Sequence, residues 1–249
     1  MRLFVHQLRA EQKLFWRSRE LAFFTFLLPI LFFLLLGSAY GDEEINGVSG
    51  YQYLLAGMIG YGAASTTFAG LALLLVIRRE SGVLKRLRAT PLPPSTYVAA
   101  VLGSIIFIFL VEAAILIAIG RFGYDVPMPD SFASLILVIL LGAASFAALG
   151  VGLTALIKSA EGSSAVVNAL YLPLSFISGA FFAADTFPEV LQKLALLLPL
   201  SHLIRLTRDV MVYDDGIWDH LGDAAVVAVW GVIGLIGAVR GFRWEPRER

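Results

Sequence analysis

The stretch that decides the fold runs from Tyr97 to Gly120 and reads YVAAVLGSIIFIFLVEAAILIAIG. Its only charged side chain is Glu112, which lies midway along it. A helix needs about 20 apolar residues to cross the roughly 30 Å hydrocarbon core of a bilayer. The stretch is therefore long enough to span a membrane as one helix.

Five further apolar stretches flank it, separated by short polar segments. They cover residues 21–39, 53–77, 132–157, 165–184 and 221–239. Only 15% of the chain is charged, against about a quarter in soluble domains. Because a backbone in hydrocarbon must satisfy its own hydrogen bonds, each stretch is predicted to be a helix. The sequence thus predicts an all-α membrane protein with six transmembrane helices in residues 21–239. The last is the weakest, since Asp223 lies in its first turn.

Several classes of functional site have no motif in this sequence. There is no cysteine, and the pair Gly-Lys that ends a phosphate-binding P-loop does not occur. Neither G-x-S-x-G nor H-E-x-x-H is present, and His6, His202 and His220 are too scattered to predict a metal site. We therefore expect no catalytic site, cofactor or metal on this chain.

The basic residues predict the orientation of the helices. Fifteen of the nineteen lysines and arginines lie in the N-terminal segment, the loops after the second and fourth stretches, and the C-terminal tail. Basic residues favour the cytoplasmic side of a membrane. We therefore expect a multi-pass protein of the cell membrane with both termini cytoplasmic, the tail being residues 240–249.

The N-terminal segment, residues 1–20, has the pattern of an amphipathic helix. At 100° per residue one narrow stripe is basic and the other side is mainly apolar. The stripe consists of Arg2, His6, Arg9, Lys13 and Arg17. This pattern indicates a helix lying flat on an anionic leaflet. The plainer interpretation is a topology signal that anchors the first span.

The most specific stretch is the loop Arg78–Leu92, which reads RRESGVLKRLRATPL. The spacing of Glu80, Leu84, Leu87 and Arg88 predicts a short amphipathic helix over residues 80–88. Pro91 and two later prolines then stop it. A short helix at the cytoplasmic rim can fit a groove on a soluble partner, although an ordinary basic loop would obey the charge rule equally well.

This loop resembles that of the ABC-2 type permeases, the membrane subunits of one class of ATP-binding cassette exporters. Their pattern is roughly R-E-x-G-T-L-x-x-L-x-x-T-P. The chain has a valine at position 83, where threonine is usual, and otherwise matches at Arg79, Glu80, Gly82, Leu84, Leu87, Thr90 and Pro91. Two later motifs, Ser178–Phe182 followed by Pro188, and Leu198–Ser201 with Arg208 downstream, are similar to the family's and follow in the same order. The chain resembles the daunorubicin-resistance type more than the polysaccharide-exporting type.

The resemblance implies a half-transporter. Two copies, or this chain and a related permease, would form a twelve-helix pore in membrane lipid. A separate ATPase subunit would hydrolyse ATP with Mg²⁺, and residues 80–88, with Arg79, Thr90 and Pro91 beside them, would be the coupling helix that it moves. No nucleic-acid partner is expected.

The outer segment between the last two spans contains an apolar run, Val190–Leu200, that is too short to cross. The resemblance implies two short helices over about residues 186–212 that re-enter the outer leaflet and cap the pathway. Pro188 would start the first helix, Pro199 would separate the second, and Phe181 and Phe182 would belong to this cap. A small packing lid without a gating role is the alternative.

Glu112 is the one acid deep within a span. A charge there costs about 2.5–3.5 kcal/mol on insertion scales, so the side chain should face other helices or water. We favour a packing or relay role over contact with cargo; a protonated glutamate bonded to a neighbouring hydroxyl is the plainer interpretation.

Two other functions compete with an ATP-driven exporter. An ion- or proton-coupled secondary transporter could be built from two three-helix halves, but the halves share no visible pattern, and Glu112 is the only midplane carrier. An intramembrane enzyme would need a nucleophile and base that the sequence lacks. The cargo, whether drug, lipid, glycoconjugate or peptide, does not follow from the residues.

Overall fold

The chain folds as a bundle of helices with one small β-hairpin at its end. A computed structural model describes the chain except for residues 46, 158, 184–185, 214 and 246–249. Its first helices are α1 (Arg2–Arg17), α2 (Arg19–Tyr40), α3 (Gly50–Gly62), the π-helix η1 (Ala63–Gly70), α4 (Leu71–Glu80) and α5 (Val83–Arg88). The others are α6 (Pro94–Gly123), α7 (Phe132–Leu153), α8 (Ala160–Ile177), α9 (Glu189–Ala195), α10 (Pro199–Val212), the 3₁₀-helix η3 (Ile217–His220) and α11 (Leu221–Gly241). Strands β1 (Glu44–Ile45) and β2 (Val48–Ser49) pair antiparallel, with Glu44 opposite Ser49.

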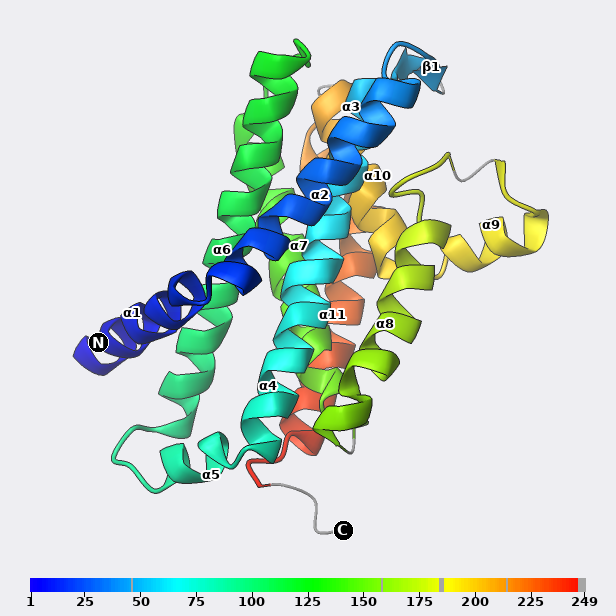
Figure 1. Cartoon of the computed structure of the whole chain (residues 1–249). Helices are drawn as coiled ribbons and strands as arrows, with labels where there is room; N and C mark the ends of the chain where they lie inside the picture. Colours follow the sequence, from blue (N-terminus) through cyan, green and yellow to red (C-terminus); the bar gives the residue numbers. More distant parts are fainter. Residues whose placement is uncertain (46, 158, 184–185, 214, 246–249) are drawn as a thin grey trace.

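Within the described part of the chain, five helical segments are long and apolar enough to cross a membrane. They are Arg19–Tyr40, Gly50–Glu80, Pro94–Gly123, Phe132–Leu153 and Ile217–Gly241. The pair α9 and α10, bent by 80° at its break, would be a sixth if it counts as one broken span. Together they show a multi-pass, all-α membrane protein. Figure 1 shows α5 at one end of the bundle and β1 at the other, and these are called the α5 end and the β1 end below.

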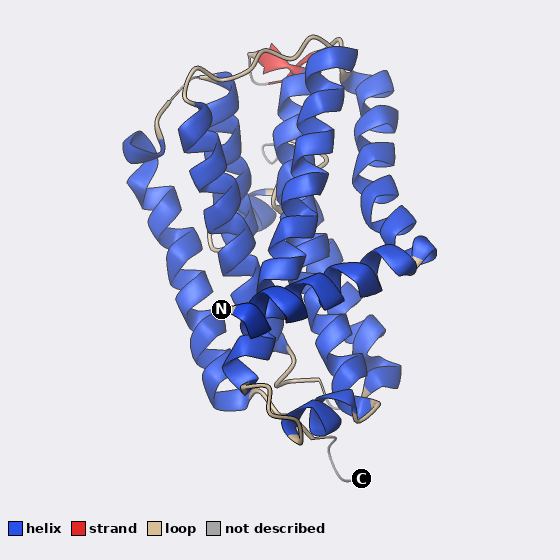
Figure 2. Cartoon of the chain, turned by 90° about the vertical axis from the view of Figure 1, so that its left-hand side faces the viewer, coloured by secondary structure: helices blue, strands red, loops and turns tan. Residues whose placement is uncertain are grey.

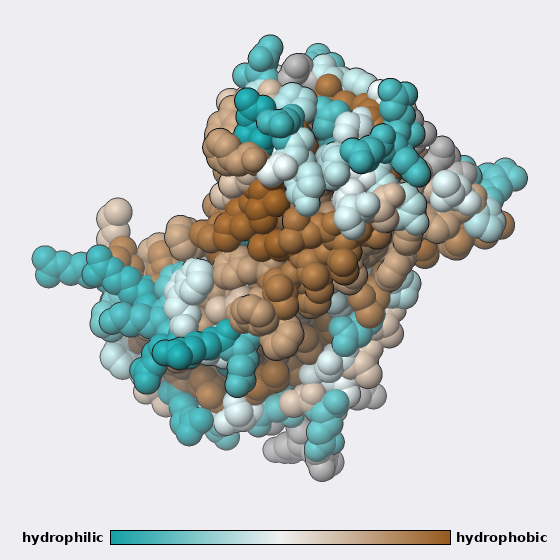
Figure 3. Space-filling model, turned by 45° about the horizontal axis from the view of Figure 1, so that its top comes forward, coloured by the Kyte–Doolittle hydropathy of each residue, from teal (hydrophilic) through white to brown (hydrophobic). Residues whose placement is uncertain are grey.

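The surface agrees with a membrane protein. Figure 3 shows hydrophobic side chains forming a band across the middle of one face, with hydrophilic side chains toward both ends. Large apolar residues on α2 and α11 remain exposed, among them Phe23, Leu35 and Leu235. Exposed apolar surface of this extent is unfavourable in water and matches the hydrocarbon of a bilayer.

Two of the six predicted spans end earlier than expected. The span expected over residues 165–184 is the helix Ala160–Ile177 instead, because Gly179 adopts a left-handed φ of 80° that ends the helix. It is also not among the five segments that are long and apolar enough to cross alone. The span expected over 132–157 ends at Leu153, where the chain turns.

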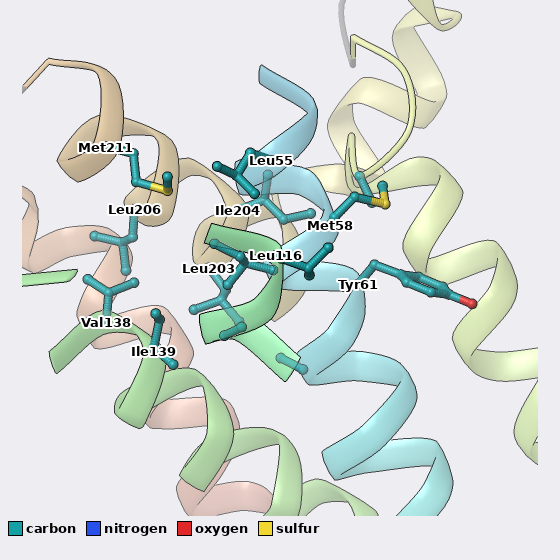
Figure 4. Close-up of a cluster of buried hydrophobic side chains, with 14 of the residues drawn as sticks. Leu55, Met58, Tyr61, Leu116, Val138, Ile139, Leu203, Ile204, Leu206 and Met211 are labelled. Carbon is teal, nitrogen blue, oxygen red and sulfur yellow. The ribbon is translucent and has the colours of Figure 1, made fainter. Parts of the chain in front are cut away.

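Of three buried hydrophobic clusters among the described residues, the largest lies nearer the β1 end and includes much of α10. Leu203, Ile204 and Leu206 of α10 are buried among residues of α3, α6 and α7 (Figure 4). Helix α11 packs along α7 at close range because both present small residues. A Cβ added to Gly152 would lie 2.7 Å from the carbonyl oxygen of Gly234, so only glycine permits this approach. The two helices therefore form a tightly packed pair.

The second span is not a regular α-helix. Its middle, Ala63–Gly70, is a π-helix that continues directly into α4. Thr67 Oγ1 donates to the carbonyl of Ala63 at 2.7 Å within this segment. π-Helical turns widen a helix and occur frequently at functional sites. The widened turn places Thr66 toward α6, which matters for Glu112 below.

Candidate coupling interface and transport groove

Helix α5 is a short helix of six residues, separate from the long helices, at the end of the bundle opposite the β-hairpin (Figure 2). We expected it to begin at Glu80, and it begins at Val83 instead. The physical reason is Gly82, whose φ of 71° lies in the left-handed region and turns the chain after Ser81. Glu80 is thus the last residue of α4 and not part of α5.

Helix α5 has one buried side and one basic side. Leu84 is fully buried in a cluster that also contains Leu71 and Leu75 of α4 and Tyr97 of α6. Leu87 is half-buried, while Lys85, Arg86 and Arg88 are exposed. Thr90 and Pro91, also exposed, follow the helix, and Thr90 Oγ1 donates to the carbonyl of Leu87 at 2.6 Å. Leu84 therefore anchors α5, and the basic side chains form its free surface.

Arg79 lies in the interior and not on that free surface. Its side chain is 2% exposed, and its two terminal nitrogens donate to the carbonyls of Thr154 at 2.9 Å and Ile157 at 2.7 Å. Its Nε donates to Glu80 at 2.9 Å. A cation that binds the last carbonyls of a helix also opposes the negative end of the helix dipole. Arg79 therefore ties α4 to the end of α7 and cannot itself contact a soluble partner.

The neighbouring Arg78 binds in a different direction, which the sequence did not lead us to expect. Its Nη2 lies 2.6 Å from Glu11 of α1, and its Nη1 donates to Tyr97 Oη of α6 at 2.8 Å. Gln7 Nε2 donates to the other oxygen of Glu11 at 2.9 Å. The sequence signal that could have predicted this ion pair is Glu11 itself, because an acid on the apolar side of the α1 helix needs a cationic partner. Arg78 and Arg79 together form what we call the arginine junction.

Helix α1 rests on α6 and leaves its basic stripe free. Gln12 Nε2 donates to the carbonyl of Ser104 at 3.0 Å and to its hydroxyl at 2.9 Å. All five stripe residues are exposed: Arg2, His6, Arg9, Lys13 and Arg17. The stripe is thus a continuous basic surface on one side of α1.

A groove of about 480 Å³ lies beneath the elbow between α1 and α2, and η1, α4, α6 and α8 form its other walls. We call it the membrane groove. Most of its lining is apolar. The hydroxyl and amide groups that it contains are those of Tyr61, Ser65, Thr66, Ser104, Asn168, Tyr171 and Thr25.

Glu112 reaches the wall of this groove through Thr66. Its side chain is buried at 1% exposure, and its Oε2 accepts a hydrogen bond from Thr66 Oγ1 at 2.6 Å. Its Oε1 has no hydrogen-bond partner among the described residues. Gly62 makes room for it, since a Cβ there would lie 2.5 Å from Oε1. The carboxyl therefore connects α6 with the π-helix.

The four residues expected in the outer cap do not form one patch. Phe181 is buried, with its ring 5.2 Å from those of Phe32 and Tyr61, whereas Phe182 is exposed. Pro188 is exposed and precedes α9, while Pro199 is buried as the first residue of α10. The two prolines thus bound the pair of short helices.

His202 and His220, which are 18 residues apart in the sequence, both lie beside acidic residues of α10, α11 and the segment between them. Ligand atoms of Asp209, His220 and Asp223 all lie within 4.8 Å of one another. His220 Nε2 is 2.9 Å from Asp215, and Arg205 is 3.4 Å from Asp223. The cationic neighbours lead us to interpret this cluster as a network of ion pairs.

The comparison with known proteins identifies the family of this chain. Residues 2–212 match the ABC-2 type transporter family. The chain belongs to this family. The matched family is one of transporter membrane proteins, which agrees with the multi-pass helical fold.

Known proteins, two of them named as ABC transporter permeases, share parts of its sequence. It is 28% identical over 202 residues to the daunorubicin resistance ABC transporter permease DrrB1 of Streptomyces coeruleorubidus, which covers 78% of this chain and 69% of that one. It is 41% identical over 75 residues to nodulation protein J of Rhizobium leguminosarum bv. trifolii, covering 30% and 29%. It is 23% identical over 152 residues to the probable multidrug permease YbhR of Escherichia coli K12, covering 60% and 41%. The matches thus span less than half the length of the last two relatives.

Proposed function

We propose that this chain is the pathway-forming subunit of an ATP-driven exporter, with its α5 end in the cytoplasm. A separate ATPase subunit binds ATP and Mg²⁺ and docks on the free basic surface of α5. Two permease subunits, identical or related, enclose the pathway. One observation carries this proposal. Helix α5 presents a basic surface outward, and the end of α4 just before it is joined to α1, α6 and α7 through the arginine junction.

The free surface of α5 defines the chemistry of its partner. Lys85, Arg86 and Arg88 are exposed, and Leu84 holds the helix from below. A complementary groove would carry acidic side chains, because opposite potentials direct docking and its orientation. The role as docking site thus belongs to the exposed residues of the expected coupling helix, while Arg79, Glu80 and Leu84 position it.

The arginine junction supplies a route for motion. Successive residues on a helix point about 100° apart, since a turn has 3.6 residues. Arg78 accordingly reaches α1 and α6, and Arg79 reaches α7. A displacement of α5 at the end of α4 therefore acts on α1, α6 and α7 together. Packed interfaces of this kind move between discrete arrangements and do not deform gradually.

The length of α6 supports the placement of α1 at the membrane surface. At 1.5 Å per residue its 30 residues extend about 45 Å, roughly 15 Å more than the hydrocarbon core. Helix α1 crosses α6 at Ser104, about ten residues and 15 Å from Pro94. With α1 lying at the interface, the first turns of α6 and the whole of α5 project into the cytoplasm.

The membrane groove suits an amphipathic or hydrophobic small molecule. Its walls are mainly apolar, and a few hydroxyl and amide groups could fix the orientation of a ligand. The names of two relatives refer to daunorubicin resistance and to multidrug transport, which agrees with this class of cargo. Export, and not import, is the direction that we propose on the same basis.

The test is to co-purify the chain with a candidate ABC ATPase subunit from the same cell and to measure ATP hydrolysis in proteoliposomes. We expect the double variant Arg86→Glu, Arg88→Glu to lose the ATPase while it still inserts normally. The matched control is Arg121→Glu, an exposed arginine at the other end of the bundle. Retention of the ATPase by the double variant would contradict docking on α5.

A further inference from the structure

The bend between α9 and α10 leaves backbone carbonyls that accept no hydrogen bond from the backbone of either helix. Helix α9 ends at Ala195, and α10 begins at Pro199 after a turn of 80°. The last carbonyls of any helix lack partners within it, and in a low-dielectric environment each unpaired group is costly. A bend of this kind therefore needs donors from elsewhere.

Side chains of α10 and α11 supply those donors. His202 Nε2 lies 2.9 Å from the carbonyl oxygen of Leu196, and Trp230 Nε1 donates to the carbonyl of Leu197 at 3.1 Å. Trp230 belongs to α11 and lies 33 residues along the chain from Leu197. Two successive carbonyls of the bend are thus bound by two different helices.

The second nitrogen of His202 extends this contact to α11 as well. Its Nδ1 makes a short contact with Asp223 Oδ1, and Arg205 lies 3.4 Å from the same oxygen. A carbonyl oxygen can only accept, so the proton on Nε2 is required by Leu196. The contact between Nδ1 and the carboxyl of Asp223 thus joins the residue that binds the bend to the first turn of α11.

The two sides of this contact differ in how firmly they are held. Helix α11 is packed against α7 at glycine-to-backbone distance, as described for Gly152 and Gly234. Helix α9 instead exposes much of its surface: Val190 is 70% exposed and Leu197 beside the bend is 65% exposed. The bend is thus a lightly packed element attached to a rigid one.

We propose that His202, Asp223 and Trp230 form a latch that holds the α9–α10 bend against α11, and that its release opens the outer cap during transport. Release frees the carbonyls of Leu196 and Leu197, which only water or cargo can then bind. The bend consequently opens only when the pathway beside it becomes hydrated. The holding step rests on the observed contacts, and the release step rests on the function proposed above.

Hydrogen–deuterium exchange on the full chain in lipid nanodiscs tests the holding step. We expect the backbone amides of residues 194–198 to exchange at least tenfold faster in Asp223→Asn and His202→Phe, and less markedly so in Trp230→Phe. His202→Gln keeps a donor near the position of Nε2 and should restore part of the protection. The control is Asp219→Asn, which removes the negative charge of the side chain that accepts from the Gly216 amide at the same end of the molecule. Exchange at wild-type rates in the bend of all three latch variants would overturn the latch.

ATP hydrolysis by the complex with its ATPase tests the release step. A weakened latch opens more readily, so Trp230→Phe and His202→Gln should raise the basal rate several-fold while α6 and α7 keep their protection from exchange. Suppose that both variants exchange faster in the bend but hydrolyse ATP at the wild-type basal rate. The contact would then be purely structural, and the release step would be overturned. If even the wild-type chain fails to bind or stimulate the ATPase, the proposed function fails while the exchange result still stands for the latch.

Discussion

At the scale of single residues, buried polar groups connect helices that hydrophobic packing alone would leave free to slide. Arg79 satisfies two carbonyls at the end of α7, and Glu112 accepts a hydrogen bond from the π-helix. Each group is expensive to bury, so each is informative about how its neighbours are held.

Replacement of Arg79 should destabilise the protein strongly. Arg79→Ala leaves the carbonyls of Thr154 and Ile157 and the carboxylate of Glu80 without their donor, at a cost of about 3 kcal/mol or more. Arg79→Lys should recover little, because a single ammonium does not reproduce the planar fork of the guanidinium. Detergent unfolding followed by tryptophan fluorescence measures both. The exposed Arg86→Ala should stay within about 0.5 kcal/mol of wild type, and an equally small effect of Arg79→Ala would contradict the junction.

The role of Glu112 can be separated from that of a proton carrier. If Glu112 is a polar packing or relay group between helices, Glu112→Gln should retain folding and most transport, because glutamine keeps the size and the hydrogen bond. Glu112→Leu should impair both. Thr66→Val should cost about 1 kcal/mol, and the effects of Thr66→Val and Glu112→Leu should not add, because the two side chains share one hydrogen bond. Transport in vesicles, with and without ATP and a pH gradient, is the functional readout. Gradient-driven transport without ATP, lost in both Glu112 variants, would favour a secondary transporter.

At the scale of elements, glycines with a left-handed φ set the ends of helices. Helix α8 ends where Gly179 turns left-handed, and α5 begins where Gly82 does. Hydropathy does not detect such turns, which is why both boundaries differ from those expected.

Gly82→Ala should destabilise the protein by about 1 kcal/mol through backbone strain alone, since a left-handed φ is unfavourable for alanine and a Cβ at this position meets no atom within 4 Å. It should also weaken binding of the ATPase, because α5 would leave its position. Gly222→Ala is a matched comparison: its Cβ also meets nothing, but it lies in the helix α11, so the change should stabilise by up to about 1 kcal/mol. Equal effects of the two substitutions in unfolding experiments would argue against strain at Gly82.

At the scale of the whole molecule, the absence of cysteine makes the orientation directly measurable. Glu44→Cys at the β1 end and Arg86→Cys at the α5 end introduce one exposed thiol each. In intact cells a membrane-impermeant maleimide should label the first and should label the second only after permeabilisation. The reverse pattern would place α5 outside the cell and exclude docking of a cytoplasmic ATPase on it.

The amino-acid sequence by itself determined the class of the protein, most of its membrane-crossing segments and its family. Apolar spans and turn residues are properties of short stretches of chain, so both can be recognised in the sequence without knowledge of the fold. The position of α5, too, followed from its motif to within a few residues, and Glu112 was expected to face other helices.

The tertiary structure alone decided which polar groups meet. Arg78 and Glu11 are 67 residues apart, Arg79 and Thr154 are 75 apart, and His202 and Asp223 are 21 apart. Nothing local marks such partners, because a contact between helices depends on how the whole bundle packs. For the same reason, the motif at Arg79, Glu80 and Leu84 indicated a coupling region, but only the fold separates the residues that anchor it from the basic surface that remains free.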